Sequence, residues 1–251
     1  ACNMGGMGFI ENNKAECMLS VLVNTHMLMA CKEHKVKKYF FSSSACAYNK
    51  DLQDKPDISG LKESDAYPAN PEDGYGWEKL FSERMCRHYL EDYGLDVKVA
   101  RYHNVYGPNG TYDGGREKAP AALCRKIIIA KEKNSDIIDV WGDGKQTRSF
   151  LFIEDCVNAT LQFFNSNHHG PINIGSEEKV SINEMIEKIE KISSKKFKKN
   201  YQLDKPKGVR GRSSNNDLIR KLLKWEPKYN LYEGLKKTYQ WIEEDMKKNN
   251  Q

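Results

Sequence analysis

Apolar positions along the first hundred residues switch between helical and strand-like spacing. Residues 15–34, "AECMLSVLVNTHMLMACKEH", and residues 75–94, "YGWEKLFSERMCRHYLEDYG", have the period of helices, and Gly94 fits the C-cap of the second one. The runs "VKKYFFSS" at 36–43 and "DVKVARYHNVYG" at 96–107 predict buried strands. Helix and strand therefore alternate, which is typical of a parallel α/β sheet.

Beyond residue 107 the predicted elements are shorter and more mixed. They are a helix in "APAALCRKIIIAKEK", a strand in "IIDVWGDG", a strand and helix in "SFLFIEDCVNATLQFF", a strand in "PINIG", and helices in "SINEMIEKIEKI", 215–224 and 231–248. Ser181 and Glu184 form a capping-box pattern at the start of one of these helices. We predict a sheet-based domain over residues 1–105 and a smaller mixed α/β lobe over 106–251, with the lobes interleaved.

Composition places the chain among ordinary globular proteins. It has 251 residues, 39% hydrophobic and 30% charged, and no apolar run approaches the ~20 residues that span a bilayer. The opening residues "ACNMGGMGFIENN" lack the charged and apolar regions of a signal peptide, so none is predicted there. Its seven cysteines contain no C-x-x-C pair, so neither a metal site nor a disulfide framework is predicted. Free thiols indicate a reducing compartment, and we predict the cytoplasm.

The net charge of +5 does not indicate a nucleic-acid-binding protein. Lysines gather in "SSKKFKKNYQLDKPKGVRGR" at 193–212, but aromatic residues are not interleaved with a continuous basic stripe. A solvated surface is the simplest interpretation of this run, with a site for an anionic ligand as the alternative.

Tyr75 and Lys79 lie four residues apart at the head of the strong helix and therefore share one face. An ammonium beside a phenol favours the phenolate, which can take a hydroxyl proton while a hydride leaves the same carbon. A bare Y-x-x-x-K is more often a surface pair. Here it follows a strand ending in "SSS" and precedes a strand ending in "RYHNVYGP".

This order of motifs resembles the extended short-chain dehydrogenase/reductase superfamily, whose members act on nucleotide sugars. The resemblance implies a Rossmann-like doubly wound parallel sheet with a smaller substrate lobe, and NAD as cofactor. It implies that Ser44 binds the sugar hydroxyl being oxidised, that Tyr75 and Lys79 also bind the nicotinamide ribose, and that Asn104 contacts the substrate. Without the family, His103 and Asn104 fit strand-end structure equally well.

Within that superfamily the chain is most similar to the GDP-mannose 3,5-epimerases, over residues 1 to about 245. The motifs are "MGGMGFI", "SSSAC", "YGWEKL", "RYHNVYGPNGTYDGGREKAPAALCRK", "WGDGKQTRSF", "NIGSEEKVSINEM" and "VRGRSSNN". Oxidation at C4 would acidify the C–H bonds at C3 and C5, and two acid/base groups must then face each other across the ring. The resemblance implies that Cys46 and Lys118 are this pair, with the thiolate as base and the ammonium as acid. By itself Cys46 could also be a core thiol.

The resemblance also implies the residues that bind substrate, the partners and the assembly. The substrate-binding residues are Gly5, Ser44, Ala45, Cys46, Asn104, Glu117, Lys118, Ala119, Lys126, Gln146, Thr147, Arg148 and Arg212. Lys126 and Gln146 also fit a helix surface and a turn. The implied partners are GDP-mannose and its GDP-hexose products, with no nucleic acid and no membrane, and the superfamily habit is a homodimer.

The chain departs from this pattern in three places. No glycine-rich G-x-x-G-x-x-G or G-x-G-x-x-G turn stands between a strand and a helix, where NAD pyrophosphate would bind. We therefore expect the chain to correspond to the C-terminal two-thirds to three-quarters of an epimerase. Asn49 and Gly74 replace a usual proline and alanine, and are expected to loosen Cys46 and Tyr75. The alternatives are another nucleotide-sugar 4-epimerase or 4,6-dehydratase, or a non-catalytic truncated homologue.

Overall fold

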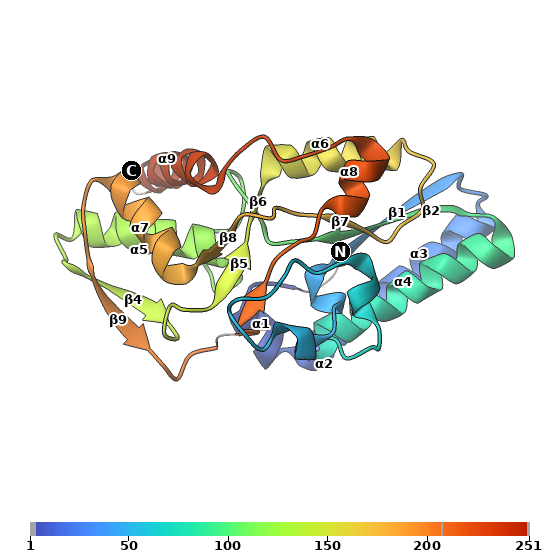
Figure 1. The fold of residues 1–251 in the computed structure, drawn as a ribbon, viewed down its shortest axis with the longest axis horizontal. Helices are drawn as coiled ribbons and strands as arrows, with labels where there is room; N and C mark the ends of the chain where they lie inside the picture. Colours follow the sequence, from blue (N-terminus) through green and yellow to red (C-terminus); the bar gives the residue numbers. More distant parts are fainter. Residues whose placement is uncertain (1–3, 207, 250–251) are drawn as a thin grey trace.

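A parallel sheet in the strand order β1-β2-β7 organises the part of the molecule that carries the N-terminal half of the chain (Figure 1). The structure, a computed structural model, describes residues 4–206 and 208–249. β1 (Lys38–Ser44) pairs with β2 (Asp96–Tyr102), and β2 pairs with β7 (Ile172–Ile174). Ser44 is opposite Tyr102, and Tyr102 is opposite Ile174, so the carboxyl ends of the three strands lie level.

Helices cover both faces of this sheet. α3 (Ser20–Glu33) and α4 (Asp73–Tyr93) pack on one face, where Phe41 joins a core with Leu28 and Cys86. α6 (Ile153–Phe164) and α8 (Asp217–Leu223) pack on the other, where Phe40 contacts Phe163. Adjacent residues of a strand point to opposite faces, so the run "YFF" supplies both cores at once. This arrangement, seen in Figure 1, matches the predicted doubly wound sheet.

The predicted helix at 15–34 is divided in two. α1 (Met7–Asn12) and α2 (Lys14–Met18) precede α3, and Leu19 separates α2 from α3 while keeping helical angles of φ −58° and ψ −18°. The predicted C-cap of α4 is confirmed, because Gly94 has φ +68° and its N–H donates to the Leu90 carbonyl. A left-handed cap of this kind favours glycine.

The second half of the chain encloses the largest apolar core. Three helices surround it: α5 (Ala119–Glu132), α7 (Ile182–Ser193) and α9 (Leu231–Asn249). The short strands are β3 (Val105–Tyr106) with β6 (Leu151–Phe152), β5 (Thr147–Ser149) between β10 (Gly211–Arg212) and β8 (Lys179–Ser181), and β4 (Ile137–Trp141) with β9 (Lys198–Gln202). The capping box at Ser181 and Glu184 is confirmed by hydrogen bonds of 3.1 and 2.7 Å.

The single strand predicted at 96–107 is divided at His103 and Asn104 into β2 and β3, which belong to different sheets, and β8, β9 and β10 were not predicted from the sequence. β9 reads "KKNYQ" and has no buried residue, so it carries no apolar alternation. It is a strand because its backbone pairs in parallel with β4. β8 and β10 are only three and two residues long and pair with β5. Backbone pairing across the fold leaves no local signal of this kind in the sequence.

Segments beyond residue 106 contribute to the first sheet. β7 is one of its strands, and Ile219 of α8 lies in the core against it. The helices of the region from Ala45 to Glu72 are three short 3₁₀ helices: η1 (Ala45–Ala47), η2 (Lys50–Gln53) and η3 (Glu63–Ala66). The division at residue 105 stays a prediction.

A buried ion pair joins the sheet to α4. Arg101 of β2 donates to both carboxylate oxygens of Glu83, at 2.9 and 2.6 Å, and also to the Glu63 carbonyl at 2.7 Å. The Ser43 hydroxyl of β1 donates to Glu83 as well. Burial opposes the charge on Arg101, but the carboxylate of Glu83 raises the pKa of Arg101 above its usual value. This network fixes the end of β1 against the helix that carries Tyr75.

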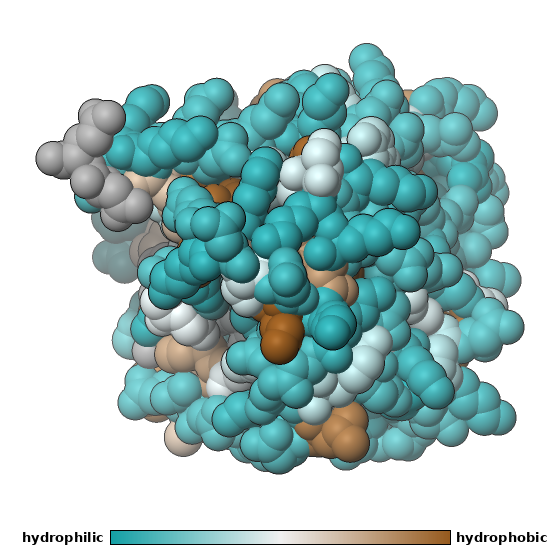
Figure 2. Space-filling model, turned by 90° about the vertical axis from the view of Figure 1, so that its left-hand side faces the viewer, coloured by the Kyte–Doolittle hydropathy of each residue, from teal (hydrophilic) through white to brown (hydrophobic). Residues whose placement is uncertain are grey.

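The surface is mainly hydrophilic on the side that carries β4 and β9. Figure 2 views this side, and the hydrophobic residues on it appear as separate patches. Ile137, Trp141, Tyr201 and Leu203 are among the exposed apolar residues of this region. None of the helices described here has the length and apolar character needed to cross a membrane.

Candidate active site

The candidate site begins at the carboxyl end of β1. Ser44 is its last residue, and the chain turns there into η1, where the Cys46 N–H donates to the Ser44 hydroxyl oxygen at 3.2 Å. Ala45 and Cys46 are buried. Ligands of open parallel sheets bind outside the carboxyl ends of the strands, so these residues are well placed to meet one.

Tyr75 and Lys79 are both buried on the first turns of α4, beside η1. The Lys79 ammonium nitrogen lies 5.4 Å from the centre of the Tyr75 ring and 5.0 Å from that of Phe41. It is also 3.5 Å from Oε2 of Glu78, which is fully buried. The structure therefore brings Ser44, Cys46, Tyr75 and Lys79 to one place.

Arg212 of β10, from the second half of the chain, reaches the Cys46 sulfur. Its Nη1 donates to Sγ at 3.4 Å, its Nη2 to Oε2 of Glu72 at 2.8 Å, and its Nε to Oε1 of Gln53 at 2.6 Å. Burial disfavours the guanidinium charge, but Glu72 and Cys46 raise the pKa of Arg212 above its usual value. The predicted substrate contact of Arg212 stays a prediction, because here its donors bind protein groups.

The N-terminal glycines pack directly on the segment that leads to Lys118. The Gly6 N–H donates to the Arg116 carbonyl at 3.0 Å. A Cβ atom on Gly6 would lie 2.4 Å from the Glu117 carbonyl oxygen, and one on Gly5 would lie 2.8 Å from Cβ of Phe9. This close backbone approach requires glycine. Gly5 and Gly6 thus pack beside Arg116 and Glu117, close to Lys118, and the substrate contact of Gly5 stays a prediction.

Lys118 occupies the N-cap position of α5, followed by Ala119 as first helical residue. Burial lowers the pKa of Lys118, and Cys46 is close enough to counteract this shift. Burial likewise raises the pKa of Cys46, which Arg212 lowers and Glu72 raises further. Both net shifts favour the uncharged thiol and amine, whereas the family resemblance implied a thiolate and an ammonium.

The remaining predicted residues lie along β5 and around Trp141. The Lys126 ammonium donates to the Asp139 carbonyl and lies 5.7 Å from the centre of a Trp141 ring, and the Gln146 amide donates to the Trp141 carbonyl. Oε1 of Gln146 is buried with no hydrogen-bond partner among the described residues. The Thr147 hydroxyl donates to the Pro56 carbonyl. Thr147 is paired with Gly211 of β10, beside Arg212.

Three further predicted residues contact backbone or side-chain groups near the two clusters. The Asn104 amide donates to the Ser149 carbonyl at 3.0 Å. Glu117 accepts a hydrogen bond from Arg125 at 3.1 Å. Arg148 is buried, and it donates to the carbonyls of Thr147 and Val209. Burial and the nearby Arg212 lower the pKa of Arg148 to about 10.

The two departures from the family pattern are tightly packed rather than loose. The Asn49 amide donates to the Pro68 carbonyl at 3.0 Å and its oxygen accepts from the Asp51 N–H at 2.9 Å. A Cβ on Gly74 would lie 2.4 Å from the Lys14 carbonyl oxygen. The expectation that both positions loosen the site is therefore wrong for this structure, because one is hydrogen-bonded and the other admits close backbone packing.

Sequence reasoning missed Glu72, Gln53 and Glu78. Glu72 stands at the N-cap position of α4, but its side chain makes no capping hydrogen bond. A glutamate at a helix start is ordinarily read as a partner of the helix dipole, so its sequence position gave no sign of its role. Gln53 is the last residue of a 3₁₀ helix, which carries no functional motif. Glu78 was passed over because the motif residue next to it is Lys79. Only the contacts of these residues mark them.

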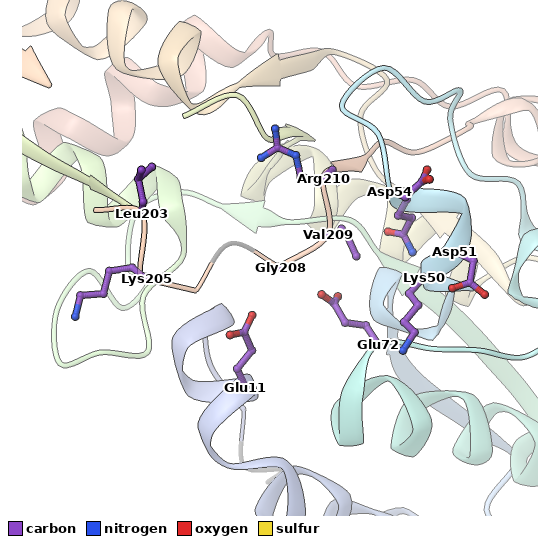
Figure 3. A pocket seen from close by; sticks show the side chains of 11 residues that line it. Glu11, Lys50, Asp51, Asp54, Glu72, Leu203, Lys205, Gly208, Val209 and Arg210 are labelled. Atoms are coloured by element: carbon purple, nitrogen blue, oxygen red, sulfur yellow. The ribbon is translucent and has the colours of Figure 1, made fainter. Parts of the chain in front are cut away.

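A groove of about 710 Å³ adjoins the site without including the predicted catalytic residues (Figure 3). Its lining residues are Glu11, Lys50, Asp51, Gln53, Asp54, Glu72, Leu203, Lys205, Gly208, Val209 and Arg210. Two of them, Gln53 and Glu72, bind Arg212 on their other side. In Figure 3 the carboxylates of Glu11 and Glu72 point into the same space. The groove is therefore linked to Cys46 through Glu72 and Gln53, which both bind Arg212.

The free energy of unfolding of the protein is expected to depend on pH through His103, which follows β2 and is fully buried. Its Nε2–H donates to Oδ1 of Asn173 at 2.9 Å, and burial lowers its pKa from 6.5 to about 3. Between these values the unfolded chain binds the proton that the folded chain excludes, so stability falls as pH falls. We expect this residue to contribute a slope of about 1.4 kcal/mol per pH unit.

Urea unfolding at several pH values between 7 and 4.5 measures this slope. The His103→Gln variant removes the titrating group and keeps a hydrogen-bond donor, so its stability should vary less with pH than that of the unsubstituted chain. Equal slopes for the two proteins would show that His103 does not exclude the proton in the folded state.

Comparison with known proteins bears on the assignment of this site. Residues 7–175 match the model of the NAD dependent epimerase/dehydratase family. The chain belongs to the NAD dependent epimerase/dehydratase family. It is 46% identical to the GDP-mannose 3,5-epimerase of Arabidopsis thaliana over 249 residues, which cover 99% of this chain and 65% of that protein. The resemblance indicated by the motifs is thereby confirmed, and this epimerase/dehydratase chain spans about 65% of the length of that curated relative.

Solved structures of related epimerases confirm the fold. The UDP-glucose 4-epimerase of Thermotoga maritima superimposes with a TM-score of 0.86 at 23% identity, covering 98% of this chain and 76% of that one. A UDP-glucuronic acid 4-epimerase of Bacillus cereus in complex with NAD has a TM-score of 0.77 at 28% identity, covering 97% and 71%. The chain thus has the Rossmann-like α/β fold of the epimerase/dehydratase family.

Proposed function

We propose that the chain epimerises GDP-mannose at C3 and C5 to GDP-L-galactose through a transient 4-keto sugar. The observation that carries this proposal is that the buried thiol of Cys46, packed with Tyr75, lies near enough to the partly buried amine of Lys118 for their charges to interact. A 4-epimerase or a 4,6-dehydratase does not need this pair. Similarity to the Arabidopsis GDP-mannose 3,5-epimerase supports the same reaction.

Each reacting side chain has a distinct task in this reaction. Tyr75 takes the proton of the C4 hydroxyl, with the Lys79 ammonium close to its ring. Ser44 binds the same hydroxyl. Once C4 is a ketone, Cys46 and Lys118 remove a proton from one face of C3 or C5 and supply one to the other. The group on one face gains the proton that leaves the carbon, and the group on the other face gives up its own, so the two side chains exchange protonation states in each epimerisation.

The residues present fit the nicotinamide end of NAD. Lys79 is buried beside Tyr75 at the sheet edge where the ribose would lie, and both side chains would hold it. When bound, NAD would supply the hydride acceptor at C4 and return the hydride at the end. These 251 residues contain no glycine-rich turn for the pyrophosphate, so binding by this chain alone is expected to be weak.

The two buried arginines suit the diphosphate of a GDP-sugar. Arg148 and Arg212 are near enough for their charges to interact, and the pKa of Arg148 falls to about 10, owing first to burial and then to Arg212. An anion bound between them would relieve this repulsion, and a guanidinium donates two hydrogen bonds to a phosphate group. Lys126, Gln146 and Trp141 would then face the more distant part of the nucleotide.

Proton NMR of GDP-mannose in D₂O, with the chain and added NAD, tests the proposal. Deuterium at both C3 and C5 is the expected result. Inversion at C4 alone would indicate a 4-epimerase, and loss of the C6 hydroxyl would indicate a 4,6-dehydratase. An absence of any exchange, while the chain binds GDP-mannose, would support a non-catalytic homologue, which the missing glycine-rich turn favours.

A homodimer in the cytoplasm completes the proposal. Leu22 and Met29 of α3 and Trp77 and Phe81 of α4 are apolar, and each is between 45 and 55% exposed. Pairing these two helices with their copies would bury this surface. Analytical ultracentrifugation should give twice the chain mass, and Phe81→Glu should give the monomer. A monomer at micromolar concentration without substitution would contradict the dimer.

A further inference from the structure

Arg212 lies between a thiol and a carboxylate and uses all three nitrogens of its guanidinium. Nη1 donates to Sγ of Cys46 at 3.4 Å, Nη2 to Glu72 at 2.8 Å and Nε to Gln53 at 2.6 Å. The side chain of Arg212 is only 4% exposed and that of Glu72 only 9%. Water therefore screens their charges little, and both act strongly on the neighbouring sulfur.

We propose that Glu72 is a positioning residue that holds Arg212 against Cys46 and balances its charge, so that Cys46 keeps its proton until substrate is bound. Glu72 acts on the sulfur through the guanidinium and touches no reacting atom itself. The significance of this role for catalysis rests on the proposed function, but the ionisation of Cys46 can be measured without it.

The physical reason lies in the opposite signs of the two neighbours. A guanidinium hydrogen-bonded to a sulfur stabilises the thiolate, as in many reactive cysteines. A carboxylate on the far side of the same guanidinium opposes this effect. Arg212 lowers the pKa of Cys46 and Glu72 raises it, while burial raises it most. Burial opposes the charge of Glu72 itself, but Arg212, Arg148 and the Val209 backbone together lower the pKa of Glu72 below its usual value.

The backbone of Glu72 and Gly76 holds η1 in place without help from the Glu72 side chain. The Glu72 N–H donates to the Cys46 carbonyl at 3.3 Å, and a Cβ on Gly76 would lie 2.3 Å from that carbonyl oxygen. The backbone before α4 is thus packed on η1 independently of the Glu72 side chain. A substitution of that side chain changes the charge near Arg212 and leaves this backbone contact in place.

Other charged and titratable groups also face Cys46, and they define what the test must hold constant. Lys118 approaches from the start of α5, Arg148 from β5, and Tyr75 from α4. The cations among them favour the thiolate, as Arg212 does. Glu72 is a carboxylate whose negative charge raises the pKa of the Cys46 thiol. Its neutralisation should therefore shift the balance toward the thiolate.

The pH profile of Cys46 alkylation by iodoacetamide tests this proposal, with the modified peptide quantified by mass spectrometry. The assay uses the 251-residue chain without substrate or NAD, so it gives an answer even if epimerisation fails. In Glu72→Gln the amide oxygen can still accept from Arg212, but the charge is gone. We expect the midpoint, the pH at which the alkylation rate of Cys46 is half-maximal, to fall by about one unit in this variant. This shift corresponds to a roughly tenfold gain in thiolate at neutral pH.

Two variants show whether charge or mere packing is responsible. Glu72→Asp keeps the charge and should leave the midpoint close to that of the unsubstituted chain. Glu63→Gln neutralises another largely buried carboxyl group, one that accepts from the Asn173 N–H at 2.9 Å, and should leave it unchanged. If Glu72→Gln does not fold, as judged by circular dichroism, Glu72→Met gives a second measurement with the same expected downward shift. A folded neutral variant whose midpoint is unchanged or higher overturns the proposal.

Discussion

Replacing Cys46 by alanine is expected to lower deuterium exchange at C3 and C5 of GDP-mannose by about 10²- to 10⁴-fold, the usual contribution of a positioned acid/base group. The alanine keeps the small apolar volume at the end of β1 but removes the only atom of this residue that can carry the proton. Cys46 is buried between Arg212 and Tyr75, so water is poorly placed to substitute for it.

The exchange is measured by proton NMR under conditions in which the unsubstituted protein exchanges both positions. Binding of GDP-mannose by isothermal titration should be nearly unchanged, since the diphosphate contacts remain. Cys124→Ala removes a fully buried thiol of α5 from the core that α5 shares with α9, and should retain the exchange. Retention of exchange in Cys46→Ala would remove the thiol from the mechanism.

Replacing Glu83 by alanine is expected to destabilise the protein by about 3–5 kcal/mol, because it leaves a buried guanidinium without its carboxylate. Arg101 and Glu83 are 1% and 6% exposed, and two hydrogen bonds of 2.6 and 2.9 Å join them. Ser43 loses its acceptor as well. Since the network ties β1 to α4, its loss should also separate Cys46 from Tyr75 and lower activity.

Urea unfolding at pH 7 measures the change in free energy. The matched control is Glu91→Ala, which breaks exposed contacts with Arg87 at 2.7 Å and His88 at 2.9 Å near the C-terminal end of the same helix. Exposed pairs contribute only about 0.2–1 kcal/mol, so the two variants should differ several-fold in their effect. Equal, small losses in both would mean that Arg101 finds another partner or reaches water.

The sequence was sufficient for much of the site because several motifs act locally. The spacing of Tyr75 and Lys79 puts them on one helical face, and Gly94 ends that helix as predicted. The run "SSSAC" ends β1 and begins η1, which contains Cys46. The charge balance around Cys46 could not be predicted, since Glu72 and Arg212 are 140 residues apart in the chain.

Sequence by itself determined the order of elements, the helix caps and the two-faced strand β1, because hydrophobic period, glycine and capping residues act within a few positions. It also determined the family, through motifs whose residues are fixed by chemistry. Tertiary structure alone decided that β7 joins the first sheet, that the polar segment "KKNYQ" is a strand, and that Arg212 points at Cys46. Each of these depends on backbone pairing or burial between distant segments, and such contacts arise only when the chain folds.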